Sequence, residues 1–283
     1  HPIEAALVHR GFSHSLLFSI LASPAFGWVF NKATKGKYGF WLWTKLFFWG
    51  IVTHPILDMF TNYGTQFLWP FEARITFNSV FVIDPLYTVP FMVLLIWAMR
   101  LDRNSAKRRR LNRIGLIYST SYLVIGVLVK CYVWYDATQY MSEKQIKVNR
   151  MMVTPMPFTS FYWYVLGENE AEYIVAYRSL FNATIDEKPM VLRRGPHRIN
   201  ELKWKGKNQT KNLHRVTNDY YLIESKENKL IVYDLRFGLL SKFTREKINT
   251  PLMGFESEML QHRIIRTTMH RQAQWDKVDF GYY

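Results

Sequence analysis

Four long apolar stretches occupy the first half of the chain. They are separated by short polar connectors and cover about residues 12–30, 39–60, 80–99 and 114–134. A helix needs about 20 mostly apolar residues to cross the hydrocarbon core of a bilayer. Helices buried in a large soluble core are the alternative, but four such stretches with basic connectors favour an α-helical, multi-pass membrane bundle of about four spanning helices.

From about residue 136 the pattern changes to that of a polar, strand-rich region. Runs of aromatic and β-branched residues predict strands over residues 161–166, 173–181, 220–224 and 229–235. Gly167-Glu-Asn and Lys226-Glu-Asn are typical of hairpin turns within each pair of runs. Before the strands we expect an amphipathic helix near residues 137–148 and a proline-containing linker at residues 151–158.

The two patterns predict two domains. Residues 1–135 form the membrane domain, and residues 136–283 form a small β-rich, mixed α/β soluble domain. The mean hydropathy of −0.13 therefore averages over two unlike halves. The single cysteine, Cys131, excludes a disulfide framework or a cysteine-based zinc site within the chain.

The net charge of +15 raises the question of nucleic-acid binding, because basic clusters attract phosphates. Residues 100–113 hold seven lysines and arginines against one acid, but they lie between two apolar stretches. Such a run is typical of a cytoplasmic loop of a membrane protein. We therefore expect membrane lipid, and no nucleic acid, as a partner.

The connectors also predict the orientation of the bundle. Residues 31–38 hold three lysines and no acid, whereas residues 61–79 hold only Glu72 and Arg74 as charged groups. The positive-inside rule then puts the first and third connectors in the cytoplasm and the second outside. Both chain ends lie outside in this topology, so residues 136–283 are expected to form an extracytoplasmic domain.

This topology brings several histidines and aspartates to the outer mouth of the bundle. They come from the start of the first helix, the end of the second and the start of the third: His9, His14, His54, Asp58 and Asp84. Ionisable groups in membrane segments are costly, and they mark candidate functional sites by default. The sequence therefore predicts a site at this end of the bundle.

His54 and Asp58 are four residues apart, so their side chains fall on one face of a helix. An imidazole and a carboxylate at this spacing can share a divalent metal, and zinc is the expected ion. The alternative is an outward-facing histidine beside a helix-terminal aspartate. No HExxH motif occurs, which argues against a standard zinc peptidase.

His9 and His14 do not share a helix face, since five residues correspond to about 140° of rotation. Gly11 offers a turn between them and Ser13 an N-cap for the following helix, so a loop followed by a helix would bring both imidazoles to one ion. Ordinary interfacial histidines are the alternative.

The remaining polar residues near this mouth have two interpretations each. Asp84-Pro85 fits either a ligand or the N-terminus of a helix, where aspartate caps and proline follows. Arg10 and Arg74 are expected to hold an anionic, phosphate-like substrate group, with Asn62 and Gln66 beside them. Single interfacial anchors are the alternative for these four.

Five short segments of the first half resemble one known family. They are His9-Arg-Gly-Phe-Ser-His-Ser15, Thr53-His-Pro-Ile-Leu-Asp58, Thr61-Asn-Tyr-Gly-Thr-Gln66, Leu68-Trp-Pro70 and Ile83-Asp-Pro-Leu-Tyr87. The chain resembles the YdjM-like membrane-bound metal-dependent hydrolases, also described as LexA-regulated and inner-membrane-associated. The resemblance covers roughly residues 1–135.

The resemblance implies phosphoester hydrolysis at a metal cluster, because the family is distantly similar to zinc-dependent phospholipase C and related nucleases. It implies ligands at His9, His14, His54 and Asp58, with Asp84 as a further candidate. Family members have an earlier helix with a Pro-Asp-x-Asp motif that adds carboxylates. Since the chain does not open with methionine, we expect that segment to be absent and the cluster to be part of a larger site.

Together these observations predict a metal-dependent hydrolase at the outer face of a bacterial inner membrane. A phosphoester, either a small molecule or a lipid headgroup, would be its substrate, and the metal would activate water. Arg10 would bind phosphate, and Asp58 or Asp84 would act as general base if not a ligand. The alternatives are a non-catalytic membrane protein with a structural metal site and a periplasmic binding module, or a transporter.

Overall fold

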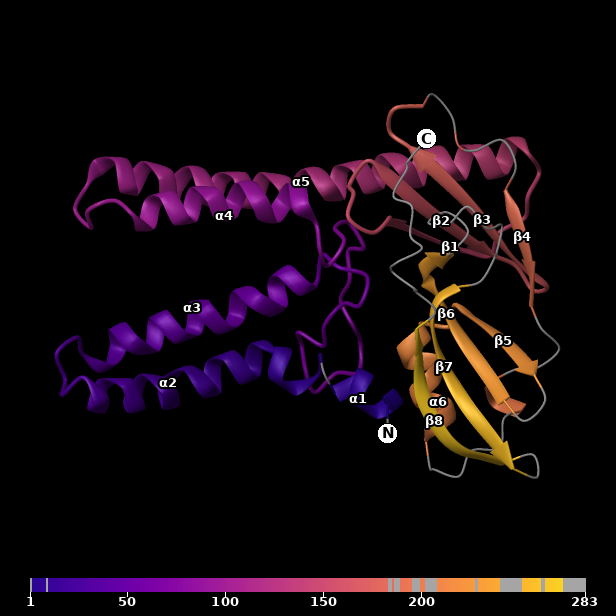
Figure 1. The fold of residues 1–283 in the computed structure, drawn as a ribbon, viewed down its shortest axis with the longest axis horizontal. Helices are drawn as coiled ribbons and strands as arrows, with labels where there is room; N and C mark the ends of the chain where they lie inside the picture. Colours follow the sequence, from indigo (N-terminus) through magenta and orange to yellow (C-terminus); the bar gives the residue numbers. More distant parts are fainter. Residues whose placement is uncertain are drawn as a thin grey trace.

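The computed structural model describes residues 2–8, 10–182, 185, 189–194, 199–201, 208–226, 229–239, 251–260 and 263–271. Two helical hairpins extend from one side of a β-rich region (Figure 1). Their helices are α2 (Leu16–Ala33), α3 (Phe40–Asp58), α4 (Pro85–Met99) and α5 (Ala106–Glu143). A short helix, α1 (Pro2–Val8), and a 3-10 turn, η1 (Phe12–His14), precede them.

Two of the four expected spans are supported by the length and composition of the helices. They are α2 and α5, and their most apolar windows are only 17% and 11% buried, unlike core helices of a soluble protein. Helix α4 has 15 residues, which span about 22 Å of a core about 30 Å thick. Polar Lys45, His54 and Asp58 lower the mean hydropathy of α3. The prediction of four spans is therefore not supported.

Helix α5 is longer than the sequence predicted. It begins inside the basic run of residues 100–113 and continues for 38 residues, about 57 Å, through residue 135 and into the second half. The amphipathic helix expected near residues 137–148 is the last part of α5. The linker expected at residues 151–158 is wrong, because strand β1 (Arg150–Pro155) lies there.

Two antiparallel four-stranded sheets make up the second half, so the expected β-rich domain is confirmed. The first sheet contains β1, β2 (Tyr162–Glu168), β3 (Glu172–Ser179) and β4 (Met190–Arg193). The second contains β5 (Tyr221–Lys226), β6 (Lys229–Leu239), β7 (Pro251–Leu260) and β8 (Arg263–Arg271). The 3-10 turn η2 (Ile199–Glu201) and helix α6 (Gln209–Thr217) connect them.

The four predicted strands fall on β2, β3, β5 and β6, and the two predicted hairpins join them. In the first hairpin, the Asn169 side chain accepts hydrogen bonds from the backbone N–H groups of Ala171 and Glu172. In the second, Lys226 pairs with Lys229, and the two connecting residues lie outside the described residues.

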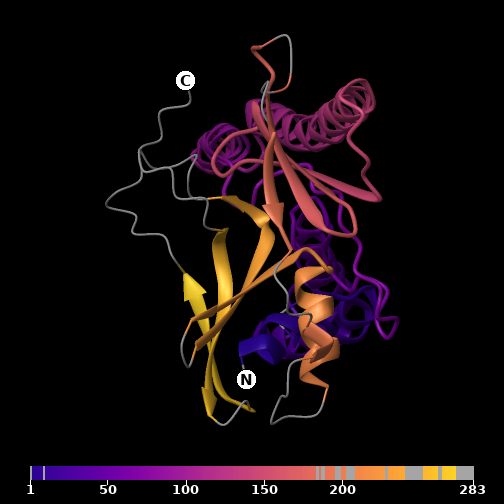
Figure 2. The ribbon, with the colours of Figure 1, turned by 90° about the vertical axis from the view of Figure 1, so that its right-hand side faces the viewer.

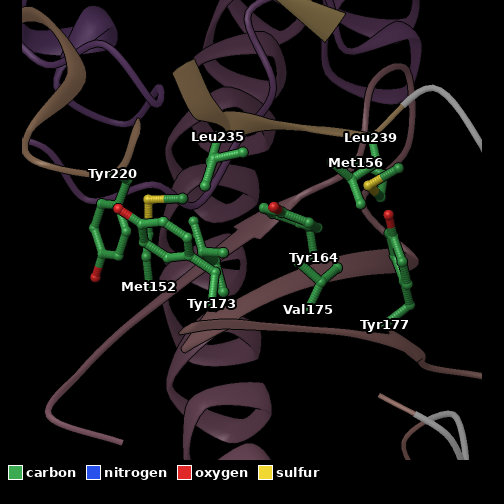
Figure 3. Packing of buried hydrophobic residues seen from close by; sticks show 10 residues of the cluster. Met152, Met156, Tyr164, Tyr173, Val175, Tyr177, Tyr220, Leu235 and Leu239 are labelled. Carbon is green, nitrogen blue, oxygen red and sulfur yellow. The ribbon is translucent and has the colours of Figure 1, made fainter. Parts of the chain in front are cut away.

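Both faces of the first sheet are buried. Alternate residues of β2 point to opposite faces, and Trp163 and Val165 pack against the C-terminal part of α5. On the other face, tyrosines such as Tyr164 point toward Leu235 and Leu239 of the second sheet (Figure 3). The sheet is therefore fixed between α5 and the second sheet.

Helix α1 belongs to the core of the second half although it begins the chain. Ile3 and Leu7 pack with Leu213 of α6 and with residues of β5 to β8, and Figure 2 shows α1 beside α6. The carboxylate of Glu4 accepts a hydrogen bond from Gln209 Nε2 at 2.8 Å. This contact brings the tail against the segment that leads into the first hairpin.

Replacing Tyr164 with phenylalanine is expected to leave the free energy of unfolding unchanged or to raise it by about 1 kcal/mol. The Tyr164 hydroxyl is buried and has no hydrogen-bond partner among the described residues, so its burial is uncompensated. Burial also raises its pKa well above the usual value. Chemical unfolding of both proteins in detergent measures the difference, and a clear loss of stability would contradict it.

Candidate metal centre

A short turn positions His14 at the start of the first hairpin. Residues 12–14 form η1, and Ser15 caps α2 by accepting a hydrogen bond from the backbone N–H of Phe18 at 3.0 Å. The N-cap predicted at Ser13 is therefore wrong, and Ser13 has another contact. Its Oγ lies 3.1 Å from Nδ1 of His14, which leaves Nε2 of that ring directed at the cluster.

His14, His54 and Asp58 come together as the sequence predicted. One ligand atom from each lies within 4.8 Å of the other two. Oδ2 of Asp58 is 3.6 Å from His14 Nε2 and 3.9 Å from His54 Nε2, and the two imidazole centroids are 5.1 Å apart. Within the described part of the chain, this is the one group of three or more such ligands.

The three side chains differ in their exposure. The side chains of His14 and Asp58 are 13% and 14% exposed, whereas that of His54 is 67% exposed. The i, i+4 spacing in the last turns of α3 puts His54 on the same face as Asp58. The cluster is therefore closed on the side of η1 and open on the side of His54.

Arg10 lies against the same carboxylate. Its Nε is 3.2 Å from Asp58 Oδ2, and its Nη1 donates a hydrogen bond to Thr61 Oγ1 at 2.8 Å. Its guanidinium carbon is 4.8 Å from the centroid of the Tyr63 ring. Burial lowers the pKa of Arg10, and the Asp58 carboxylate opposes this shift. The cluster thus has one fixed positive charge beside its one carboxylate.

Asp84 is not brought into the cluster. Its Oδ1 accepts hydrogen bonds from the backbone N–H groups of Leu86 and Tyr87, which makes it the N-cap of α4. Its Oδ2 accepts from Tyr122 at 2.8 Å and from Ser160 at 2.6 Å. The residue is 1% exposed. Of the two interpretations of Asp84-Pro85, the N-terminus of a helix therefore accounts for this position. Neither a ligand role nor a general-base role is supported by it.

The connector of residues 61–79 holds the predicted substrate residues, but they are not all at the cluster. The backbone N–H of Gln66 bonds to the Arg10 carbonyl at 3.1 Å, which fixes the connector against the segment before η1. Asn62 Oδ1 accepts a hydrogen bond from Thr154 of β1 at 2.5 Å. Arg74 lines a neighbouring cavity. His9 lies outside the described residues.

Gly64 allows this connector to fold back on itself. Its φ is +64°, and a Cβ at this position would lie 2.7 Å from the carbonyl oxygen of Ile75. Thr65 and Ile75 form an isolated antiparallel bridge. A side chain at residue 64 would therefore disturb the connector that holds Arg10.

Sequence reasoning missed several residues that surround the cluster. Ser13 lies beside His14, and Thr61 donates a hydrogen bond to the Asp58 carbonyl; their place in the segments that resemble the family was the signal for them. Arg215 and Arg236 of the tail reach the cavity beside Arg74. No motif or spacing connects them to the first half of the chain, so this contact could not be predicted from the sequence.

Comparison with known proteins identifies the first half. Residues 1–133 match the sequence model of the YdjM inner membrane protein family. This part of the chain therefore resembles the YdjM inner membrane protein family. The match confirms the resemblance derived from the five short segments, and it supports an inner-membrane location.

A curated relative matches part of the chain, and its name adds no activity. The chain is 32% identical over 94 residues to the "Uncharacterized protein YfhP" of Bacillus subtilis (strain 168). These residues are 31% of this chain and 28% of the relative, so the chain spans less than a third of that protein. No solved structure matches the chain.

Proposed function

We propose that this protein is a metal-dependent hydrolase of phosphoesters at the outer face of the inner membrane. The observation that carries the proposal is the convergence of His14, His54 and Asp58, whose ligand atoms lie within 4.8 Å of one another. Two imidazole nitrogens and a carboxylate oxygen form a donor set that suits zinc. A set of three protein ligands is typical of catalytic zinc sites, in which a further position takes water.

The surroundings of the cluster fit a divalent ion. Ser13 Oγ at 3.1 Å from His14 Nδ1 provides a partner for the second ring nitrogen, as is usual for metal-ligating histidines. With the proton on Nδ1, the lone pair of Nε2 is directed at the ion. A metal bound there would supply a water of lowered pKa and polarise the scissile phosphoryl group.

Arg10 is the residue best placed to bind the substrate phosphate. It already lies 3.2 Å from Asp58, and an ion on that carboxylate would compete with this contact and release guanidinium donors. A guanidinium presents paired N–H groups that match phosphate oxygens. We propose that Arg10 holds the phosphate while Asp58 holds the ion, and that Gln66 keeps the Arg10 backbone in place.

The substrate would enter from the side of His54. This side chain is 67% exposed near the end of α3, whereas His14 and Asp58 are covered. If α2 and α5 cross the membrane, the end of α3 that carries His54 would lie at the membrane surface, and so would the open side of the cluster. A lipid headgroup is therefore a natural phosphoester for the site, and a soluble phosphodiester shares the same chemistry.

In the proposed topology α2 and α5 cross the membrane, and α3 and α4 return through it although their own length and composition do not mark them as spans. The two hairpin tips lie at the end of the bundle farthest from the sheets (Figure 1), and both carry basic connectors. A chain that crosses in α2 and α5 has α3 and α4 as its return segments. The tail would then lie outside the membrane with the cluster, as the positive-inside rule predicts.

Metal analysis and hydrolysis of a chromogenic phosphodiester, both on the detergent-purified chain, test the proposal. We expect about one divalent ion per chain, and His54→Ala should lose the ion together with the activity. His214→Ala is the matched control, because His214 also contacts an aspartate, Asp219, but belongs to no group of three ligands among the described residues. Absence of stoichiometric metal from the wild type would refute the proposal.

The alternative is a purely structural metal that joins the first two helices, with the tail as a binding module. The contact of His14 in η1 with His54 and Asp58 in α3 favours neither interpretation by itself. A structural ion would leave no catalytic turnover in the presence of full metal occupancy, while His54→Ala would lower the thermal stability. The same measurements therefore separate the two.

A further inference from the structure

A polar cavity lies beside the cluster, between the first half of the chain and the tail. Its volume is about 240 Å³. Tyr63 and Arg74 of the connector form one wall, and Arg215 of α6 and Arg236 of β6 form part of the other. The cavity therefore exists only where the tail meets the connector.

Three arginines line this cavity, together with one carboxylate residue, Glu72. Arg236 is 6% exposed and forms a close pair with Asp234, at 2.7 Å between Nη2 and Oδ2. Arg215 Nη1 is 3.5 Å from a carboxylate oxygen of Glu72, whose side chain is 60% exposed. A long contact with an exposed partner is weak, so Arg215 is free to turn toward a ligand.

Arg74 has no ion-pair partner among the described residues. Its Nη2 donates to the Leu7 carbonyl at 2.8 Å, but its Nε is buried and has no hydrogen-bond partner among the described residues. Burial is the main reason that its pKa falls to about 10, and the positive charges of Arg236, Arg215 and Arg10 act in the same direction. A buried donor without a partner, surrounded by like charges, is costly, and a bound anion would offset this cost.

We propose that this cavity binds a phosphate-bearing anion, with Arg74 and Arg215 as its direct ligands and Arg236 as a buried charge behind them. Guanidinium groups are the side chains best matched to phosphate oxygens. Asn78 and Asn218 add polar atoms to the wall. Pockets for drug-sized ligands have volumes of roughly 300–1,000 Å³, so a cavity of about 240 Å³ suits a smaller, phosphate-bearing group.

The cavity is separate from the metal ligands but adjoins them. Tyr63 lines the cavity. The Arg10 guanidinium packs against the Tyr63 ring and also contacts Asp58. None of the proposed anion ligands is a ligand of the cluster, so the inference does not depend on the proposed hydrolysis. The tail then has a defined role in binding the anion, because Arg215 and Arg236 are two of the three arginines of the site.

Titration calorimetry with inorganic phosphate, on the detergent-purified chain in the presence of a metal chelator, tests the site. We expect the wild type to bind phosphate and Arg215→Gln to weaken the affinity about tenfold or more. Arg74→Gln should act likewise. Arg193→Gln is the matched control, since that side chain on β4 is 90% exposed and does not line the cavity.

Two further measurements separate a loss of phosphate binding from misfolding and from loss of the metal. Arg74 also holds the Leu7 carbonyl, so thermal unfolding of each variant excludes misfolding, and Arg215→Gln lacks that structural role. His54→Ala should keep phosphate binding even if it loses metal and hydrolysis, which separates this site from the proposed function. A wild type that binds no phosphate, or variants at Arg74 and Arg215 that bind it unchanged, would overturn the proposal.

A short-chain phosphatidate titrated in the same way distinguishes the two sources of the phosphate group. Binding at least tenfold tighter than inorganic phosphate would assign the site to a lipid headgroup, because the glycerol and acyl part would add contacts at the membrane surface. Equal affinity would assign it to a free phosphate group. In both cases Arg215→Gln should weaken the binding.

Discussion

Asp58→Asn is expected to remove most of the bound metal and to lower phosphodiester hydrolysis by about 10³-fold or more. Oδ2 of Asp58 is the common neighbour of the cluster, at 3.6 Å from His14 Nε2 and 3.9 Å from His54 Nε2. Asparagine keeps the size of the side chain but removes the negative charge that attracts the ion. It also leaves the buried Arg10 without its carboxylate partner.

Elemental analysis of the purified variant and a rate measurement with the same phosphodiester check this expectation. Asp102→Asn makes the same chemical change in the connector between α4 and α5, at the other end of the hairpins (Figure 1). This control should keep its metal and its rate. If Asp58→Asn also kept both, the carboxylate would not be a ligand and the site would need another interpretation.

The second large effect is expected on stability, from Asp136→Ala. Asp136 of α5 accepts a hydrogen bond from Nε of Arg178 of β3 at 2.5 Å, and the Arg178 side chain is 2% exposed. Removing the carboxylate breaks this ion pair at a buried guanidinium, and breaking a buried pair costs about 3 kcal/mol. For a chain of this size that corresponds to a fall of about 10 °C in the unfolding midpoint.

Thermal unfolding in detergent, followed by near-ultraviolet circular dichroism, measures this difference. Glu172→Ala is the matched control on the same strand, because it removes the partner of Arg193, whose side chain is 90% exposed, and should have little effect. Adding Arg178→Met to Asp136→Ala should recover part of the loss, since the charge and its partner then leave together. An unchanged midpoint for Asp136→Ala would contradict the expectation.

The strands could be predicted because their pattern is local. Alternation along β2 follows from the backbone geometry of any strand with both faces buried, and Trp163 and Tyr164 carry that signal. The apolar helices were found for a similar reason. Their ends were not, because the end of α5 depends on packing of Val133, Ala137 and Met141 against the first sheet, which no local pattern encodes.

In the candidate site, too, some residues could be placed from the sequence and others only from the tertiary structure. Spacing alone put His54 and Asp58 on one helix face, and the charges of the connectors brought His14 to the same end of the bundle. Only tertiary contacts decided the position of Asp84, whose oxygens accept from Tyr122 and Ser160, 38 and 76 residues away. A buried carboxylate takes the donors that the fold brings to it, and the sequence order does not reveal which these are.

The sequence by itself thus determined a helical membrane half, a β-rich tail and the core of a histidine–aspartate cluster, because each follows from periodicity or from loop charge. The tertiary structure decided that the tail rests on α1 and on the connector of residues 61–79. That contact brings Arg74 to Arg215 and Arg236. It depends on apolar burial between segments about 200 residues apart, and long-range packing of this kind leaves no local pattern in the chain.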